Sequence, residues 1–167
     1  MADNRMKYTI SSGQFPFVEI ELEAGESAYV QRGSMVYHTP GVSLNTKLNA
    51  KGDGVGKPLG RLAIAPSVPG QVITLELGQK QYRLNDGAFL ALDGSAFYTM
   101  QRQSVGRALF GGQGGFFVMT TEGQGTLLAN AFGSIRKITL QNNQITIDNA
   151  HVVALSADLD YDIHLEN

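Results

Sequence analysis

The chain has 167 residues and a net charge of −2, with 43% hydrophobic and 17% charged residues and no cysteine. A chain of this length can bury about 70% of its unfolded surface, so we expect one domain that needs no covalent staples. The lack of cysteine excludes disulfides, thiolate nucleophiles and cysteine-ligated metals. A pI near 5.9 argues against a broad basic nucleic-acid-binding face.

Membrane and secretion signals are also missing from the sequence. No apolar run approaches the roughly 18 residues of a membrane-spanning helix. The first ten residues lack the apolar core of a signal peptide. We therefore expect a cytoplasmic protein without a transmembrane segment.

Short apolar or alternating segments follow one another along the chain, separated by glycine and proline. In the clearest one, residues 17–23, Val18, Ile20 and Leu22 alternate with three glutamates. This pattern predicts a half-buried strand, and the glutamates are better explained as its solvated face than as a carboxylate site. The expected strands are residues 6–10, 17–23, 27–31, 33–38, 42–48, 61–65, 71–77, 80–84, 87–103, 116–120, 126–130, 136–140 and 144–147, with a last one after 150.

The connections between these segments are typical of antiparallel β structure. Residues 24–26 predict a turn, residues 66–70 a proline corner, and Gly78-Gln79 a hairpin loop. Residues 49–60 hold four glycines and a proline and predict an exposed loop. No segment keeps a 3.6-residue period with caps, so helix should be scarce. The fold class expected is all-β, an antiparallel β-sandwich or β-roll.

One five-residue pattern returns along the chain. Residues 33–37, Gly-Ser-Met-Val-Tyr, are matched by 87–91, Gly-Ala-Phe-Leu-Ala, and more weakly by 150–154, Ala-His-Val-Val-Ala. We interpret each copy as a tight turn that enters a buried strand. Residues 140–145 likewise resemble 22–27, which places Asn143 where Gly25 tolerates a left-handed backbone. A single domain of internal repeats, approximately 6–60, 61–108 and 109–167, is one explanation, and coincidence among short strands is the other.

The sequence offers few candidates for chemistry. Asp158, Asp160, Asp162 and His164 alternate with apolar residues, so on a strand they would share one face. They could then bind a divalent metal with help from another strand, although a solvated terminal strand is the simpler interpretation. Residues 111–115 are rich in glycine but lack the Lys-Ser/Thr of a phosphate loop, so a wide turn is the better account.

No catalytic residue can be named from these patterns. His151 lies in the third copy of the pattern, at the position where the others have Ser34 and Ala88, and a partly exposed turn histidine is the expected role. His38 is the remaining histidine. No nucleophile elbow is present. We expect neither an enzyme nor a bound cofactor.

The motifs resemble those of the altered-inheritance-of-mitochondria family, whose biochemical function is unknown. The resemblance covers nearly the whole chain and is carried by residues 17–27, 33–37, 65–70, 87–91, 109–114 and 129–133. It implies a β-sandwich like that of the tryptophan RNA-binding attenuator protein, repeated within one chain, and a homo-oligomer such as a trimer. Attenuator-like RNA or tryptophan binding does not carry over, because fold alone does not transmit function.

Two departures from the family pattern bear on partners. Residues 49–60 form a shorter loop than in relatives, and the chain stops at Asn167 where many relatives continue. Fungal relatives are linked to mitochondrial inner-membrane organisation. The resemblance implies no reaction. We therefore expect a non-enzymatic homo-oligomeric scaffold or interaction protein, with a small-ligand or divalent-metal-binding module as the alternative.

Overall fold

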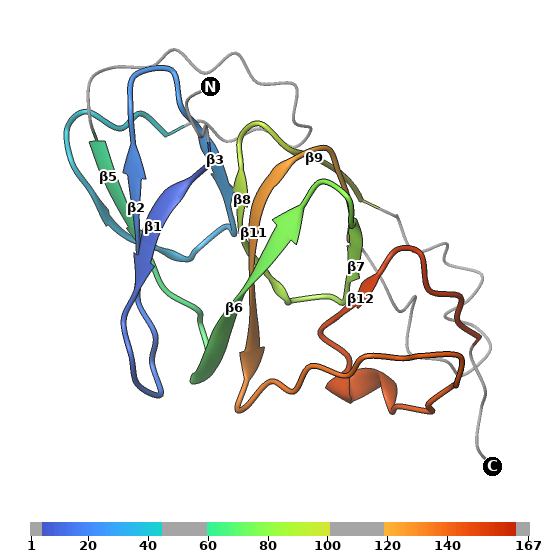
Figure 1. The fold of residues 1–167 in the computed structure, drawn as a ribbon. Helices are drawn as coiled ribbons and strands as arrows, with labels where there is room; N and C mark the ends of the chain where they lie inside the picture. Colours follow the sequence, from blue (N-terminus) through green and yellow to red (C-terminus); the bar gives the residue numbers. More distant parts are fainter. Residues whose placement is uncertain (1–4, 45–59, 101–118, 163–167) are drawn as a thin grey trace, which may run out of the picture.

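The structure is a computed structural model that describes residues 5–44, 60–100 and 119–162 (Figure 1). These residues form antiparallel β-strands and one short 3-10 helix, with no α-helix among them. The expected all-β class is therefore confirmed. The elements are β1 Lys7–Ile10, β2 Val18–Leu22, β3 Ala28–Val30, β4 Met35–His38, β5 Gly60–Ile64, β6 Gly70–Leu77, β7 Tyr82–Leu84, β8 Phe89–Asp93, β9 Phe97–Met100, β10 Met119–Glu122, β11 Gly125–Phe132, η1 Asn149–His151 and β12 Ala154–Ser156. No helix in this part of the chain is long and apolar enough to span a membrane.

The strands make three four-stranded sheets. Sheet A has the order β1-β2-β5-β4, sheet B the order β3-β8-β11-β6, and sheet C the order β12-β7-β10-β9. One core joins sheet A to sheet B through residues such as Ile20, Ile64 and Leu128. A second core joins sheet B to sheet C through residues such as Leu127 and Leu84. Sheet B contributes to both cores, which explains the continuous apolar runs of β8 and β11.

Strand β2 forms as its sequence predicts. Val18 and Ile20 are fully buried, while Glu19 and Glu21 keep partial contact with solvent on the opposite face. Strand β5 pairs with it over its whole length, and β1 pairs with its residues 18–21. The alternation of apolar and acidic residues therefore specified both the strand and its buried face.

The expected hairpin at Gly78-Gln79 is wrong. Strand β6 pairs with β11 in sheet B, whereas β7 pairs with β10 and β12 in sheet C. The glycine has a positive φ of 144°, as a turn requires, but the turn passes the chain from one sheet to the next. A turn sequence predicts that the chain changes direction and says nothing about which sheet receives the next strand.

The three copies of the five-residue pattern share one turn hydrogen bond. The backbone N–H groups of Ser34, Ala88 and His151 each donate to the carbonyl three residues earlier, over 3.1, 3.2 and 2.9 Å. The copies then diverge. Strand β8 is buried, as expected, whereas all four residues of β4 are exposed, so the expectation of a buried strand is wrong for the first copy. In the third copy η1 intervenes, and β12 begins only at Ala154.

Several expected strands do not form. Residues 136–140 and 144–147 belong to no sheet, and residues 42–44 are not a strand, while 45–48 lie outside the described residues. We call residues 136–147 the arm; it leaves the end of β11 and returns to η1 (orange in Figure 1). The left-handed residue in the arm is Asn142, with a φ of 55°, and not the expected Asn143. The arm forms no ladder with any strand of the described chain.

Candidate functional site

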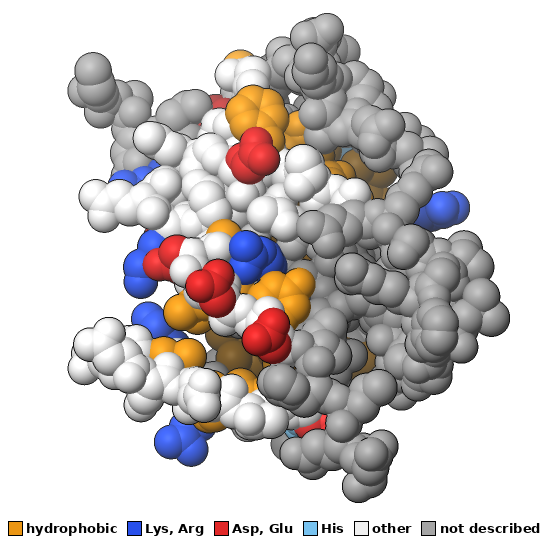
Figure 2. All heavy atoms as spheres, turned by 90° about the vertical axis from the view of Figure 1, so that its right-hand side faces the viewer, with side chains coloured by type: hydrophobic (Ala, Val, Ile, Leu, Met, Phe, Trp, Pro, Cys, Tyr) orange, Lys and Arg blue, Asp and Glu red, His pale blue; other side chains and the backbone are white. Residues whose placement is uncertain are grey.

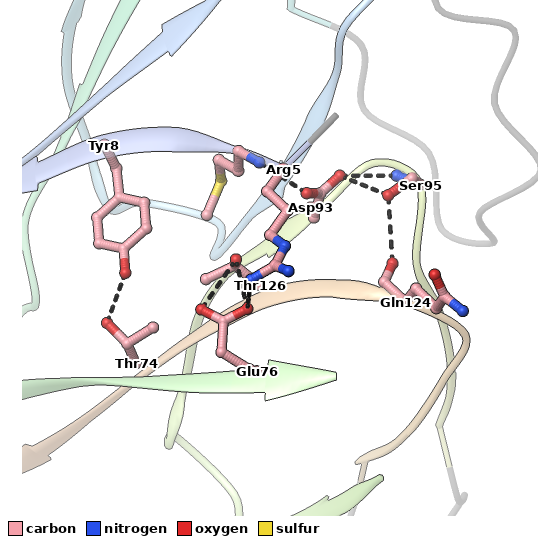
Figure 3. A network of polar contacts seen from close by, with 9 residues as sticks. Arg5, Tyr8, Thr74, Glu76, Asp93, Ser95, Gln124 and Thr126 are labelled. Atoms are coloured by element: carbon pink, nitrogen blue, oxygen red, sulfur yellow. Dashed lines mark hydrogen bonds and ion pairs between the residues drawn. The ribbon is translucent and has the colours of Figure 1, made fainter. Parts of the chain in front are cut away.

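A polar network surrounds Asp93 at the end of β8 (Figure 3). Asp93 ends β8 and is only 5% exposed. Its Oδ2 accepts the backbone N–H of Met6 over 2.8 Å. Its Oδ1 accepts the backbone N–H of Ser95 over 3.0 Å and the Ser95 hydroxyl over 2.8 Å. The carboxylate thereby closes the turn after β8 and holds the residue that precedes β1.

Neighbouring polar contacts also connect the N-terminal segment and β1 to sheet B. The Thr126 hydroxyl lies 3.3 Å from both carboxylate oxygens of Glu76, and Arg5 Nη1 lies 3.7 Å from the same carboxylate. The hydroxyls of Tyr8 and Thr74 are 2.8 Å apart and join β1 to β6. Every buried polar side-chain atom in the described residues has a hydrogen-bond partner. The network therefore acts as a clasp within the fold, and its groups are already engaged with one another.

The solvent face of sheet A carries a second polar group beside β4. The Tyr37 hydroxyl donates to the Glu19 carboxylate, and this hydrogen bond, with some burial, raises the pKa of Tyr37. The Arg61 guanidinium lies 3.8 Å from Glu19 and 4.0 Å from Glu21. The rings of Phe17 and Tyr37 are 6.0 Å apart. These contacts fix the Tyr37 side chain on the face of the sheet.

Strand β4 itself is an exposed apolar edge. Met35, Val36 and Tyr37 are 42, 55 and 42% exposed. The strand pairs with β5 on one side, and the register shifts between Met35 and Tyr37, which makes Val36 the bulged residue. Its other side is the end of sheet A among the described strands. Contiguous apolar residues on a sheet edge that no described strand covers are typical of an interaction surface.

The C-terminal aspartates do not lie on a strand as expected. Strand β12 ends at Ser156, and residues 157–162 are turn and irregular backbone, so Asp158, Asp160 and Asp162 do not share a strand face. All three are exposed, and His164 lies outside the described residues. The Ser156 hydroxyl donates to the Asp158 carboxylate, and this hydrogen bond lowers the pKa of Asp158. Metal binding by these residues stays a prediction.

The two other histidines are exposed. His38 ends β4, and its Nδ1 is 3.0 Å from the Thr39 carbonyl. His151 ends η1, with its Nδ1 3.6 Å from the Asp148 carboxylate, as expected for a turn histidine. The glycine-rich residues 111–115 lie outside the described residues.

The described residues on the right-hand side of Figure 1 carry side chains of mixed type. Figure 2 shows apolar side chains there between acidic and basic ones, without a field of one sign.

Sequence reasoning missed the Asp93 clasp. The signal was present as Asp93-Gly94-Ser95, since an aspartate followed by glycine and serine is typical of a turn closed by the aspartate side chain. The contact with Met6 joins residues 87 positions apart and has no local signature. The exposure of β4 was missed because consecutive apolar residues normally indicate burial.

Comparison with known proteins identifies relatives along the whole chain. A family model described as Mitochondrial biogenesis AIM24 matches residues 8–166. An uncharacterized protein of Streptococcus pyogenes serotype M6 is 63% identical over 191 residues, which cover 100% of this chain and 77% of the relative. The X-ray crystal structure of a Streptococcus pyogenes protein superposes with a TM-score of 0.83 at 58% identity, covering 98% of this chain and 82% of that one.

Proposed function

Since this chain belongs to the AIM24 family, described as mitochondrial biogenesis proteins, we propose that it is a non-enzymatic, homo-oligomeric scaffold or interaction protein. The observation that carries the proposal is the apolar edge of β4. Strand β8 has a similar sequence pattern and is buried in the middle of the molecule, whereas β4 leaves Met35, Val36 and Tyr37 in solvent. Strand β4 thus has the apolar sequence of a buried strand but lies exposed at a sheet edge, which supports its burial against another chain.

The composition supports the same proposal. Only 17% of the residues are charged, and the exposed side chains include large apolar ones such as Phe15, Ile138 and Ile145. Single exposed apolar residues are ordinary on protein surfaces, but a contiguous run on a strand edge marks a contact site or an aggregation hazard. Native proteins blunt such an edge or cover it, and in a homo-oligomer a second copy of the chain can cover it.

The proposal predicts that folding and self-association are linked. The thermal unfolding midpoint should rise over a roughly hundred-fold increase in protein concentration, because association stabilises the folded chain by mass action. A midpoint that does not depend on concentration would count against a homo-oligomer. The chain lacks tryptophan, so far-UV circular dichroism is the suitable signal.

The alternative is a module that binds a small ligand or a divalent metal. Its support is the sequence pattern of Asp158, Asp160 and Asp162, all of which are exposed. A metal at 100 times its dissociation constant would stabilise the folded protein by about 2.7 kcal/mol. Thermal shifts with Ca²⁺, Mg²⁺, Mn²⁺ and Zn²⁺ test this, and Asp160→Asn with Asp162→Asn should abolish any shift. The lack of a shift would remove the metal-binding alternative.

A further inference from the structure

The arm, residues 136–147, has the sequence of paired strands without a partner. It contains two apolar-Thr-apolar runs, Ile138-Thr139-Leu140 and Ile145-Thr146-Ile147, and these β-branched residues favour extended, paired backbone. Ile138, Ile145 and Ile147 are nonetheless 48, 49 and 41% exposed. No backbone hydrogen bond joins the arm to another described residue. Among the described residues, the arm therefore has no strand partner for its backbone groups, and its isoleucines are about half exposed.

The β4 edge, the side of Met35–His38 that pairs with no described strand, is likewise exposed and apolar. Natural sheet edges are usually blunted by charged side chains. The other edge of sheet A follows this rule, since β1 carries Lys7 paired with Glu23. Strand β4 contains no lysine, arginine or acidic residue, and its apolar side chains are exposed. Of the two edges of sheet A, only β4 is left without a charge that would discourage pairing.

The charges on the two surfaces are also complementary. The arm carries two cations, Arg136 and Lys137, and no acidic residue. Beside β4, the Glu19 carboxylate accepts the Tyr37 hydroxyl, and Arg61 lies near both Glu19 and Glu21, so this local cluster has two carboxylates and one guanidinium. The cations of the arm would be attracted to this local excess of negative charge.

The arm and the β4 edge of one chain lie on opposite sides of the molecule. In Figure 1 the cyan segment that carries β4 is at the left, beyond β5, and the orange arm is at the lower right. Two complementary surfaces that cannot meet within one chain can meet between copies. The contact would then be head-to-tail, because each copy would give its arm to one neighbour and its β4 edge to another. Such an assembly closes into a ring if the rotation between successive copies brings the last copy back to the first.

We propose that the arm of one copy pairs with the β4 edge of a second copy and adds a strand to its sheet A. This mode of contact obtains affinity from backbone hydrogen bonds and specificity from the alternating side chains. It gives a partner to a strand-forming segment that has none in the described chain, and it covers the apolar edge. The inference rests on the proposed self-association and assigns it a surface.

Mixing two complementary variants tests the pairing. Ile138→Asp with Ile145→Asp disables the arm and leaves the edge intact, whereas Val36→Asp disables the edge and leaves the arm intact. Each variant alone should be a monomer of 18.0 kDa. An equimolar mixture has one working arm and one working edge, so it should form a dimer of 2 × 18.0 = 36.0 kDa and nothing larger. Phe15→Asp, at an apolar residue that is 73% exposed outside both surfaces, should keep the wild-type mass.

Cysteine cross-linking traps the same contact without depending on its affinity. The natural chain has no cysteine, so every disulfide must come from the introduced residues. Val36→Cys mixed with Thr139→Cys or Thr146→Cys should give a cross-linked dimer on mild oxidation with at least one arm position, because paired strands bring Cα atoms within the disulfide range of about 4.4–6.8 Å. Thr9→Cys on β1 is the matched control and should cross-link to neither.

The outcomes separate this inference from the proposed function. A concentration-dependent unfolding midpoint without a Val36–arm cross-link above the Thr9 control would leave self-association standing and overturn this interface. A midpoint independent of concentration and no cross-link would overturn both. Amide-exchange protection of the arm that does not change with protein concentration would also overturn the inference, because the chain's own residues would then cover it. A dimer from the mixed variants together with the directed cross-link is the result that we predict.

Discussion

Asp93→Ala should destabilise the folded protein strongly, although Asp93 touches no proposed contact surface. The buried carboxylate accepts three hydrogen bonds, one from Met6 and two from Ser95. Hydrogen bonds to charged groups contribute about 1.5–3 kcal/mol each, and a buried donor left unpaired costs about 1–3 kcal/mol. Because Ser95 is exposed, water can replace part of the hydrogen bonding that Ser95 loses in the variant. We expect a loss of about 3–5 kcal/mol in the free energy of unfolding.

Asp93→Asn distinguishes the contribution of the Met6 hydrogen bond from that of the Ser95 hydrogen bonds. The amide oxygen can still accept from Ser95, but the amide NH₂ then faces the Met6 N–H, so we expect an intermediate loss of about 2 kcal/mol. Asp86→Ala removes an exposed aspartate and should change the stability by less than about 0.5 kcal/mol. Urea unfolding followed by circular dichroism, at one fixed protein concentration, measures all three variants. A loss below about 1 kcal/mol for Asp93→Ala would refute the clasp.

Two further predictions follow from close contacts elsewhere. Gly70→Ala should lower the free energy of unfolding by about 1–3 kcal/mol or more, because the added Cβ would lie 1.9 Å from the Ala131 carbonyl oxygen. The same urea assay measures this loss. Unchanged stability would contradict the packing of β6 on β11. Ser156→Ala should raise the pKa of Asp158 toward its ordinary value, as followed by NMR titration of the carboxyl group. Since the folded-state pKa is lowered, the stabilising contribution of Asp158 is present above about pH 3.9 and is lost as the pH falls through the folded-state pKa. An Asp158 pKa that is the same in the variant and the wild type would contradict the role of Ser156.

The parts of the fold that sequence predicts well are those fixed by local pattern. Strand β2 alternates apolar and acidic residues and forms with that register, because one face must be buried and the other must stay wet. The glycines at 33 and 87 have positive φ values of 85 and 77°, as the turns before β4 and β8 require. Both features depend on a few consecutive residues, so no distant contact was needed to predict them.

The errors arise where a distant contact decides the outcome. The turn after β6 leads into another sheet, and nothing in Gly78-Gln79 records which strand lies nearby. Strand β4 resembles β8 in sequence and differs in burial, since β8 lies between two sheets and β4 lies at the end of one. The arm has strand-forming residues but no partner within the described chain. Of the candidate metal residues, the described aspartates lie on irregular backbone after β12, because a short alternating run does not by itself make a strand.

The mass of the wild-type protein in solution, measured by light scattering at micromolar concentration, tests the central claim most directly. The chain has a mass of 18.0 kDa. If the exposed β4 edge is covered by a second copy, the measured mass will be two or more times that value. A single species of 18.0 kDa at these concentrations would contradict the account.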